Sequence, residues 1–204
     1  MRHRFVVRAA VFTVAAMAVM TAVAQDKKAP TPAEMEEMTK KWQEASTPGA
    51  PHKVLEMMAG EWASETKVWM AGPDAPPEVT KGSSNMKMVL DGRFLQQDMT
   101  GEMMGMKMVG LGLTGYDNIK KKFVASWVDN TSTALFTMEG TASADNMVIT
   151  MEGKMDDPGT WERDKKINYV MKIVNKDKHI FEFHEVGKDG KAQKVMEVVY
   201  TRKK

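Results

Sequence analysis

The sequence of 204 residues contains no cysteine. It therefore forms no disulfide bond, offers no thiol nucleophile or thiolate metal ligand, and has no cysteine to which a lipid anchor could be attached. Histidine is scarce as well, with four residues, and none lies in a His-x-His or His-Glu-x-x-His motif of the kind that binds zinc. Thiol chemistry is excluded, and a mononuclear zinc site has no support.

A long apolar run is also missing. The stretch Ala9–Val19 is shorter than the roughly 20 residues that a membrane-spanning helix needs. Arg2, Arg4 and Arg8 precede it and Ala22-Val23-Ala24 follows, which is typical of a secretory signal peptide cleaved after its last alanine. Cleavage removes three basic residues and leaves 26 against 27 acidic ones, so the net charge changes from +2 to −1. We expect a periplasmic or secreted protein with no membrane anchor after cleavage and no basic surface for nucleic acid.

Composition divides the chain into three parts. Residues 1–24 are predicted to be the signal peptide, residues 25–50 a flexible lead with an N-terminal helix, and residues 51–204 a single β-barrel domain. A chain of that length can bury one core without disulfides.

Two short helices are predicted before the strands. The capping box Thr31-Pro32-Ala33-Glu34 starts a helix that runs to about Ala45, with Met35, Met38 and Trp42 on one face. The Pro/Gly-rich segment 47–51 ends it. A second helix is expected over about His52–Ala59, ending at a left-handed Gly60. It places Val54, Leu55 and Met58 on one side.

From Gly60 onward the hydrophobic period changes from 3.6 to 2, which indicates strands. In the first strand we expect Trp62, Ser64, Thr66, Val68 and Met70 to face inward. Turn-rich segments, including Asp91-Gly92, separate the alternating stretches. The expected strands cover about residues 62–70, 85–90, 93–100, 106–113, 121–128, 132–139, 147–154, 161–174, 179–186 and 191–202.

Ten short strands joined by tight turns favour a mostly β fold, an antiparallel up-and-down barrel of the lipocalin or calycin type, because closure leaves no exposed sheet edge. A two-sheet sandwich is the alternative. In the last strand the period of two places Arg202 inward together with Met196, Val198 and Tyr200. We expect its guanidinium to stack on Trp62 and the helices to plug that end. Gly60, Trp62 and Arg202 are therefore predicted to be structural.

Five ordered landmarks carry a family resemblance: Gly60-Glu61-Trp62, Asp91-Gly92-Arg93-Phe94-Leu95, Gly115-Tyr116-Asp117-Asn118, Ser126-Trp127-Val128-Asp129 and Tyr200-Thr201-Arg202-Lys203. Together they resemble the bacterial exported family of unknown function numbered 1579, over about Pro51 to Lys204. The resemblance implies a calycin-like barrel, similar in plan to lipocalins and to the haem-binding nitrobindins, with no assigned reaction. The later motifs and the disulfides of lipocalins are missing.

Catalytic motifs are not found. There is no Gly-x-Ser-x-Gly elbow, and Asp156-Asp157 lies in a predicted turn. Strand parity places Glu182 outward and Glu185 inward, while His184 faces water, which favours a surface histidine over a haem ligand. We expect no catalytic residue, no cofactor and no enzyme activity.

Methionine is abundant, with 21 residues, and the densest group is Met103, Met104, Met106 and Met108. Closely spaced thioethers are suitable ligands for Cu(I). Methionine is also a pliable core residue, and the inward alternation of Met86, Met88, Met147, Ile149 and Met151 favours this second role.

The predicted function is that of an exported barrel that binds a small apolar or amphipathic molecule in its interior. Cu(I) binding or delivery by the methionine group and a filled barrel acting as an envelope scaffold are the alternatives. The ligand's identity and the oligomeric state stay open. The predicted lining consists of Ser64, Thr66, Met86, Met88, Trp127, Met151, Tyr169, Met171 and Met196.

Overall fold

The computed structural model describes residues 29–204, and the predicted signal peptide lies outside them. The chain divides into two compact units, and the boundary in the sequence lies between Trp42 and Gln43. Among the residues that the structure describes, no helix is both long and apolar enough to cross a membrane.

The first helix, α1 (Pro32–Ser46), begins at the predicted capping box. The Thr31 hydroxyl oxygen accepts a hydrogen bond from the Glu34 amide at 3.3 Å, and Glu34 Oε2 accepts one from the Thr31 amide at 2.6 Å. Two otherwise unpaired donors at the helix start are thereby satisfied.

Where two separate helices were expected, the helical part consists of two pieces broken only by residues 47–49. The second piece, α2 (Ala50–Glu56), begins and ends earlier than predicted. Its start includes Pro51, because proline suits the first turn of a helix, and His52 Nδ1 accepts a hydrogen bond from the Gly49 amide at 3.0 Å. The predicted apolar side is buried, with Leu55 and Met58 almost fully so.

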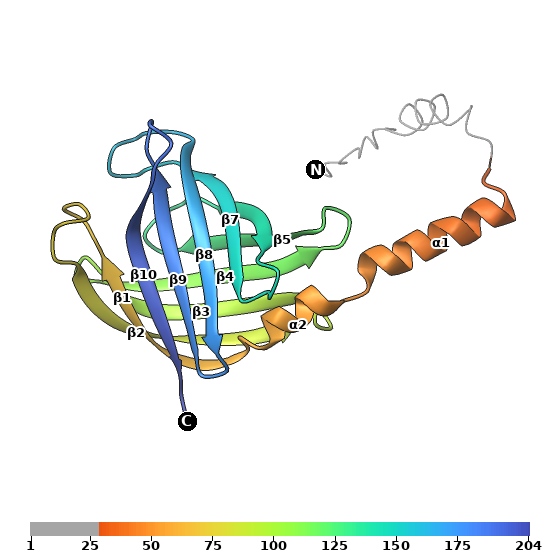
Figure 1. The fold of residues 1–204 in the computed structure, drawn as a ribbon, viewed down its shortest axis with the longest axis horizontal. Coiled ribbons are helices and arrows are strands. Elements are labelled where there is room, and N and C mark those ends of the chain that lie inside the picture. The colour runs from red at the N-terminus through yellow and green to blue at the C-terminus, as the bar shows by residue number, and fades with distance from the viewer. Residues whose placement is uncertain (1–28) are drawn as a thin grey trace, which may run out of the picture. The chain divides into compact units, whose positions relative to one another are not determined.

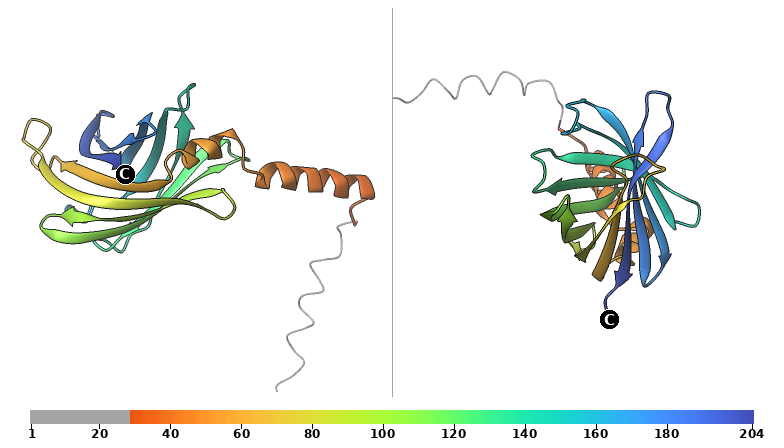
Figure 2. Two further views of the ribbon diagram at one scale, coloured as in Figure 1. Left: turned by 90° about the horizontal axis from the view of Figure 1, so that it is seen from below. Right: turned by 90° about the vertical axis from the view of Figure 1, so that its left-hand side faces the viewer.

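Ten strands follow, and each is antiparallel to its neighbours (Figures 1 and 2). The last strand pairs with the first, which confirms the closed up-and-down barrel and shows that the sandwich alternative is wrong. In Figure 1, β8–β10 cross β2–β4 steeply, as tilted strands of a small closed barrel do. The strands are β1 (Gly60–Val68), β2 (Glu78–Val89), β3 (Phe94–Met103), β4 (Met106–Asp117), β5 (Lys122–Asp129), β6 (Phe136–Ala142), β7 (Val148–Met155), β8 (Lys165–Asn175), β9 (Lys178–Val186) and β10 (Ala192–Arg202).

Several predicted strand ends are wrong, and local hydrogen bonds explain two of them. Trp161 was expected in a strand but has φ of 60° and is 89% exposed. The Asp157 carboxylate accepts hydrogen bonds from the Gly159 and Thr160 amides, which holds this segment as a loop until Lys165. Similarly, Asp129 Oδ1 accepts from the Thr131 amide at 2.9 Å, and β6 begins only at Phe136.

The β2–β3 turn differs in one detail from the prediction. Leu90, expected to be the last residue of the second strand, has φ of 51° and belongs to the turn together with Asp91 and Gly92. Similarly, β1 ends at Val68, two residues before Met70, and Met70 is 65% exposed. Side chains alternate between inward and outward only while the strand is paired with its neighbours, so the alternation ends where the strand ends.

The barrel has two unlike ends. The closed end carries α2, the start of β1 and the end of β10, while the open end is formed by the loops β1–β2, β3–β4, β5–β6, β7–β8 and β9–β10. The predicted inward side chains of Met86, Ile149 and Met151 are buried and fill the interior toward the closed end. Space remains toward the open end.

Candidate functional site

Arg202 holds the closed end together. Its guanidinium lies 4.1 Å from the centre of the Trp62 ring, as the strand parity predicted. It also donates hydrogen bonds to the carbonyl oxygens of Met57 at 3.0 Å and Ala59 at 2.8 Å, just beyond α2. A cation at a helix C-terminus satisfies carbonyls that have no intrahelical partner. Trp62 Nε1 donates to the Met58 carbonyl oxygen at 2.9 Å, so the strand, the helix and Arg202 form one unit.

Gly60 is required in this arrangement. Its φ is 139°, a conformation that favours glycine, and a Cβ atom there would lie 2.1 Å from Arg202 Nη1. Gly60 is the first residue of β1, three residues beyond the C-cap of α2, Met57, and therefore is not the helix cap that the sequence suggested.

His179 is buried between two aromatic rings at the closed end. It stacks on Tyr200 with ring centres 4.4 Å apart and meets the edge of Trp62 at 4.3 Å. Neither ring nitrogen has a hydrogen-bond partner within the described part of the chain. Burial, and then the nearby Arg202 charge, lowers the pKa of His179 to about 3. His184 faces outward on the same strand, with Nε2 3.1 Å from Glu182 Oε2.

A cavity of about 680 Å³ occupies the open half of the barrel. We call it the open-end cavity. Exposed Met70 and the loop residues Gly72 and Thr160 belong to its lining, so it reaches the loops of the open end. Its volume falls within the range of small-molecule sites in proteins.

Most of the cavity wall is apolar. Seven methionines take part: Met70, Met99, Met103, Met108, Met138, Met155 and Met196. The aromatic side chains are Trp69, Trp127, Phe136, Tyr169, Phe181, Phe183 and Tyr200.

Two glycines on the neighbouring strand make room for Trp127. Cβ atoms built on Gly110 and Gly112 of β4 would lie 2.1 Å and 3.1 Å from the indole. The ring therefore lies flat against the strand backbone, and its Nε1 donates to Asp129 Oδ2 at 2.7 Å.

Four charged side chains also line the cavity. Lys165 lies at the start of β8, and its Nζ is 3.0 Å from Asp157 Oδ2 and 2.7 Å from Glu185 Oε2. The Lys165 hydrogen bond lowers the pKa of Asp157 to about 2. Asp129 is the fourth: burial raises its pKa, but hydrogen bonds from Thr131 and Trp127 outweigh burial and lower it overall. Asp157 and Glu185 share the Lys165 ammonium group, whereas the hydrogen bonds that Asp129 accepts come from neutral donors.

Neutral polar groups form the inner end of the cavity. Gln97 Nε2 donates to the Tyr200 hydroxyl at 3.0 Å, and burial raises the pKa of Tyr200 to about 12. Burial also raises the pKa of Tyr169, whose hydroxyl makes no hydrogen bond within residues 29–204. Both phenols are therefore neutral and can orient a polar group of a ligand.

The structure divides the predicted lining residues into two groups. Thr66, Trp127, Tyr169 and Met196 border the open-end cavity. The remaining five pack in the filled part of the barrel: Ser64, Met86, Met88, Met151 and Met171. Strand parity identifies the inward face correctly but does not tell how far along the barrel each residue lies.

The predicted Cu(I) ligands are divided as well. Met103 and Met108 line the cavity, whereas Met104 and Met106 are each 60% exposed at the β3–β4 turn. Within residues 29–204, no group of three or more His, Asp or Glu side chains is placed to hold a metal ion. Cu(I) binding by the four methionines stays a prediction.

The charged side chains of the cavity were not predicted as site residues. Asp157 was interpreted as part of a turn, and Glu185 was placed inward by strand parity but was not assigned to a site. The inward parity of Glu185 was the usable indication, since an inward carboxylate in a barrel needs a cation nearby.

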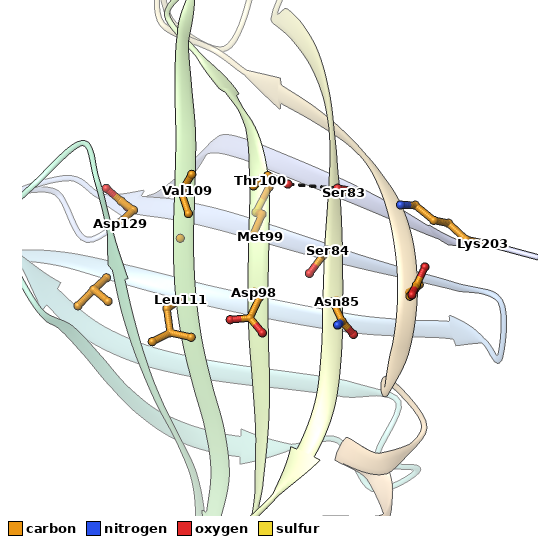
Figure 3. Close-up of a pocket in the computed structure, with 13 residues that line it drawn as sticks. Ser83, Ser84, Asn85, Asp98, Met99, Thr100, Val109, Leu111, Asp129 and Lys203 are labelled. Carbon is orange, nitrogen blue, oxygen red and sulfur yellow. Dashed lines mark hydrogen bonds between the residues drawn. The ribbon is translucent and has the colours of Figure 1, made fainter.

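A second depression, of about 610 Å³, lies over β1–β5. Figure 3 shows Asp98, Thr100, Val109 and Leu111 at its surface, with the Ser83 and Thr100 hydroxyl oxygens 3.2 Å apart. Val109 and Leu111 are exposed there, so this depression is on the outer wall of the barrel. Met99 and Asp129 belong to its lining as well as to that of the open-end cavity.

Comparison with known proteins identifies the fold. A model of the family described as "Protein of unknown function (DUF1579)" matches residues 47–202. No curated protein matches. A solved structure, that of the S-type phycobiliprotein lyase CPES from Guillardia theta, is similar with a TM-score of 0.52, covering 79% of this chain and 96% of that chain at 11% sequence identity. At such low identity the similarity shows the fold alone.

Proposed function

Since this chain belongs to the DUF1579 family of proteins of unknown function, we propose its function from its own interior: it binds one small apolar or amphipathic molecule in the open-end cavity. The observation that carries the proposal is the cavity of about 680 Å³ with its wall of methionine and aromatic side chains. Concave, mostly apolar sites with a few polar groups are the usual form of a ligand site.

The methionines and the neutral polar groups have different parts in this binding. Met103, Met108 and Met196 offer flexible, polarisable surface that adapts to the shape of a ligand. Thr66 and Tyr169 offer hydroxyl groups that orient its polar end. No catalysed reaction is assigned to the site.

Binding takes place outside the cytoplasm, in the periplasm or the medium, in accordance with the signal peptide predicted at residues 1–24. Mass spectrometry of protein from its native host tests this part. A mature chain that begins at Gln25 supports export, and a chain that keeps the intact N-terminus contradicts it.

The binding test uses N-phenyl-1-naphthylamine, an uncharged apolar dye that fluoresces strongly in apolar surroundings. We expect the full chain to bind one dye molecule and the tryptophan emission to fall, because Trp69 and Trp127 line the cavity. In Met196→Trp the larger ring occupies the cavity, and we expect the affinity for the dye to fall by about tenfold or more.

Met104→Trp is the matched control, because it makes the same exchange at an exposed turn. It should bind the dye as the unaltered protein does. Equal affinity of Met196→Trp and the unaltered protein, or no binding by either, would contradict the proposal.

The two alternative functions are tested with the same protein. The cavity volume argues against a filled barrel acting as a scaffold. Titration with Cu(I) tests the methionine group, because replacement of Met103, Met104, Met106 and Met108 by leucine should abolish Cu(I) binding if these residues hold the ion.

A further inference from the structure

We infer that the open-end cavity prefers an apolar molecule with a positively charged nitrogen to one of the same size with a carboxylate. This inference rests on the proposed binding in the cavity and adds the chemical class of the ligand.

The first step is the charge balance of the lining. Asp129, Asp157 and Glu185 are the acidic residues of the cavity, and Lys165 is its only basic one among the described residues. The lining therefore holds two more negative than positive charges. The tyrosines of the lining, Tyr169 and Tyr200, are neutral because burial raises the pKa of both.

The second step is that Lys165 is not available to an anion. Its ammonium group already contacts Asp157 at 3.0 Å and Glu185 at 2.7 Å, and its side chain is only 17% exposed. A ligand carboxylate would have to displace one of these carboxylates or lie beside both. Like charges at short range in an apolar cavity repel strongly, because water screens them poorly there.

The third step is that Asp129 has no cationic partner. It accepts hydrogen bonds from Trp127 Nε1 at 2.7 Å and from the Thr131 hydroxyl at 2.5 Å, and no cation is among its hydrogen-bond or ion-pair partners within residues 29–204. These bonds fix its orientation and keep it ionised but do not neutralise it. An ammonium group in the cavity can approach this charge together with the indole of Trp127, which also attracts cations.

Charges just outside the lining do not change this balance. Lys194 lies over the Trp69 ring at 5.2 Å, but its Nζ pairs with Glu197 at 2.5 Å and lies 3.6 Å from Glu182. Lys191 at the open end is highly exposed and lies 3.7 Å from Asp189. The charge of Lys194 is thus balanced by two carboxylates, and an exposed charge such as that of Lys191 is screened by salt.

The test compares three ligands with the same tail: octylamine, 1-octanol and octanoate, titrated calorimetrically into the full chain at pH 7. At this pH the amine is protonated and the acid ionised. We expect octylamine to bind about tenfold or more tighter than octanoate, with octanol in between.

A double variant and a control identify the charges responsible. Asp129→Asn with Glu185→Gln removes both excess negative charges and keeps hydrogen-bonding groups, so the preference for the amine should fall to within about threefold. Glu152→Gln removes one charge at an exposed position of β7 and should leave the preference unchanged. The two single variants should lie in between, which provides a readout if the double variant does not fold.

The outcomes separate the two proposals. If octanol binds and octanoate binds as tightly as octylamine or more tightly, the inference about charge is overturned while the cavity remains a binding site. If the preference persists undiminished in the folded double variant, the assignment to Asp129 and Glu185 is overturned. If none of the three ligands binds, the proposed function fails as well.

Discussion

Each end of the barrel has a tryptophan with a basic side chain over its ring, but the two pairs have different effects. At the closed end the Arg202 guanidinium lies 4.1 Å from the centre of the Trp62 ring and also bonds to carbonyl oxygens beside α2. At the open end the Lys194 ammonium lies 5.2 Å from the Trp69 ring, and its other partners are carboxylates. The first pair joins three segments, whereas the second leaves the interior accessible.

This difference shows that contact between a cation and a tryptophan ring does not by itself close the end of a barrel. Closure depends on the remaining hydrogen bonds of the cation, because the planar fork of arginine can bond to several carbonyl oxygens at once while lysine acts as a point charge. The following variants test this contrast, beginning with the largest expected effect.

The filled and the open half of the interior should differ most in their response to truncation. Ile149→Ala removes a fully buried side chain and should lower the free energy of unfolding by about 2–5 kcal/mol. Met196→Ala removes a side chain that already borders the cavity and should lower it by only about 1 kcal/mol. Urea denaturation measures both, and equal losses would show that the cavity is not open in solution.

Arg202→Met should lower the free energy of unfolding by about 3 kcal/mol, because bonds from a charged donor to three carbonyl oxygens are lost. The third of these belongs to Lys176, 2.7 Å from Nε. Lys194→Met at the open end should lower it by about 1 kcal/mol or less, since its pairs are partly exposed. Arg202→Lys should behave more like Arg202→Met than like the unaltered protein. If Arg202→Met lowered the free energy of unfolding as little as Lys194→Met does, the two ends would not differ in the way described.

Gly60→Ala should lower the free energy of unfolding by about 2 kcal/mol, from strain at its positive φ and the contact with Arg202. Gly72 is the control at the open end, because its φ of 99° is also positive but nothing lies within 4 Å of a Cβ there. Gly72→Ala should therefore lose about 1 kcal/mol, from strain alone. Thermal unfolding of the two variants measures the difference, which should vanish if Arg202 does not lie at Gly60.

His179 should make the closed end sensitive to acid. The pKa of His179 is about 3 in the folded protein against 6.5 ordinarily. Between these pH values the unfolded chain therefore binds a proton at His179 that the folded protein does not bind. The contribution of the buried, neutral His179 to the free energy of unfolding is complete above about pH 6.5 and is lost as the pH falls toward 3. Between pH 7 and pH 5.5 the unaltered protein should lose about 1 kcal/mol more than His179→Phe.

Urea denaturation at both pH values tests this prediction. Octanol binding at the open end provides the contrast, because it should be the same in His179→Phe as in the unaltered protein at each pH. Identical pH profiles of stability for the two proteins would show that His179 is not buried in its neutral form.

The barrel could be predicted from the sequence because the patterns that indicate strands and turns involve residues close together in the chain. The period of two from Trp62 onward, the turn at Asp91-Gly92 and the parity that places Arg202 inward all depend on residues near one another in the chain. Errors arose where side chains override the pattern, as at Asp157, whose carboxylate holds a loop in place of the expected strand.

The site was only partly predictable, for a different reason. Parity placed Met151 and Met196 on the same inward face, yet one fills the core and the other borders the cavity. A bulge between Lys194 and Met196 shifts the register with β9, so that alternation read from the end of β10 does not continue to its start. Nothing in the local sequence marks this shift.

Composition, hydrophobic period and turn residues were thus sufficient for the ten-stranded closed barrel and for the role of Trp62 and Arg202, because strand pairing between chain neighbours follows from alternation. The tertiary structure alone decided where the interior stays open and that Lys165 meets Asp157 and Glu185 there. Asp157 lies in the loop before β8, Lys165 at the start of β8 and Glu185 near the end of β9. The course of that loop and the register between β8 and β9 bring them to one wall.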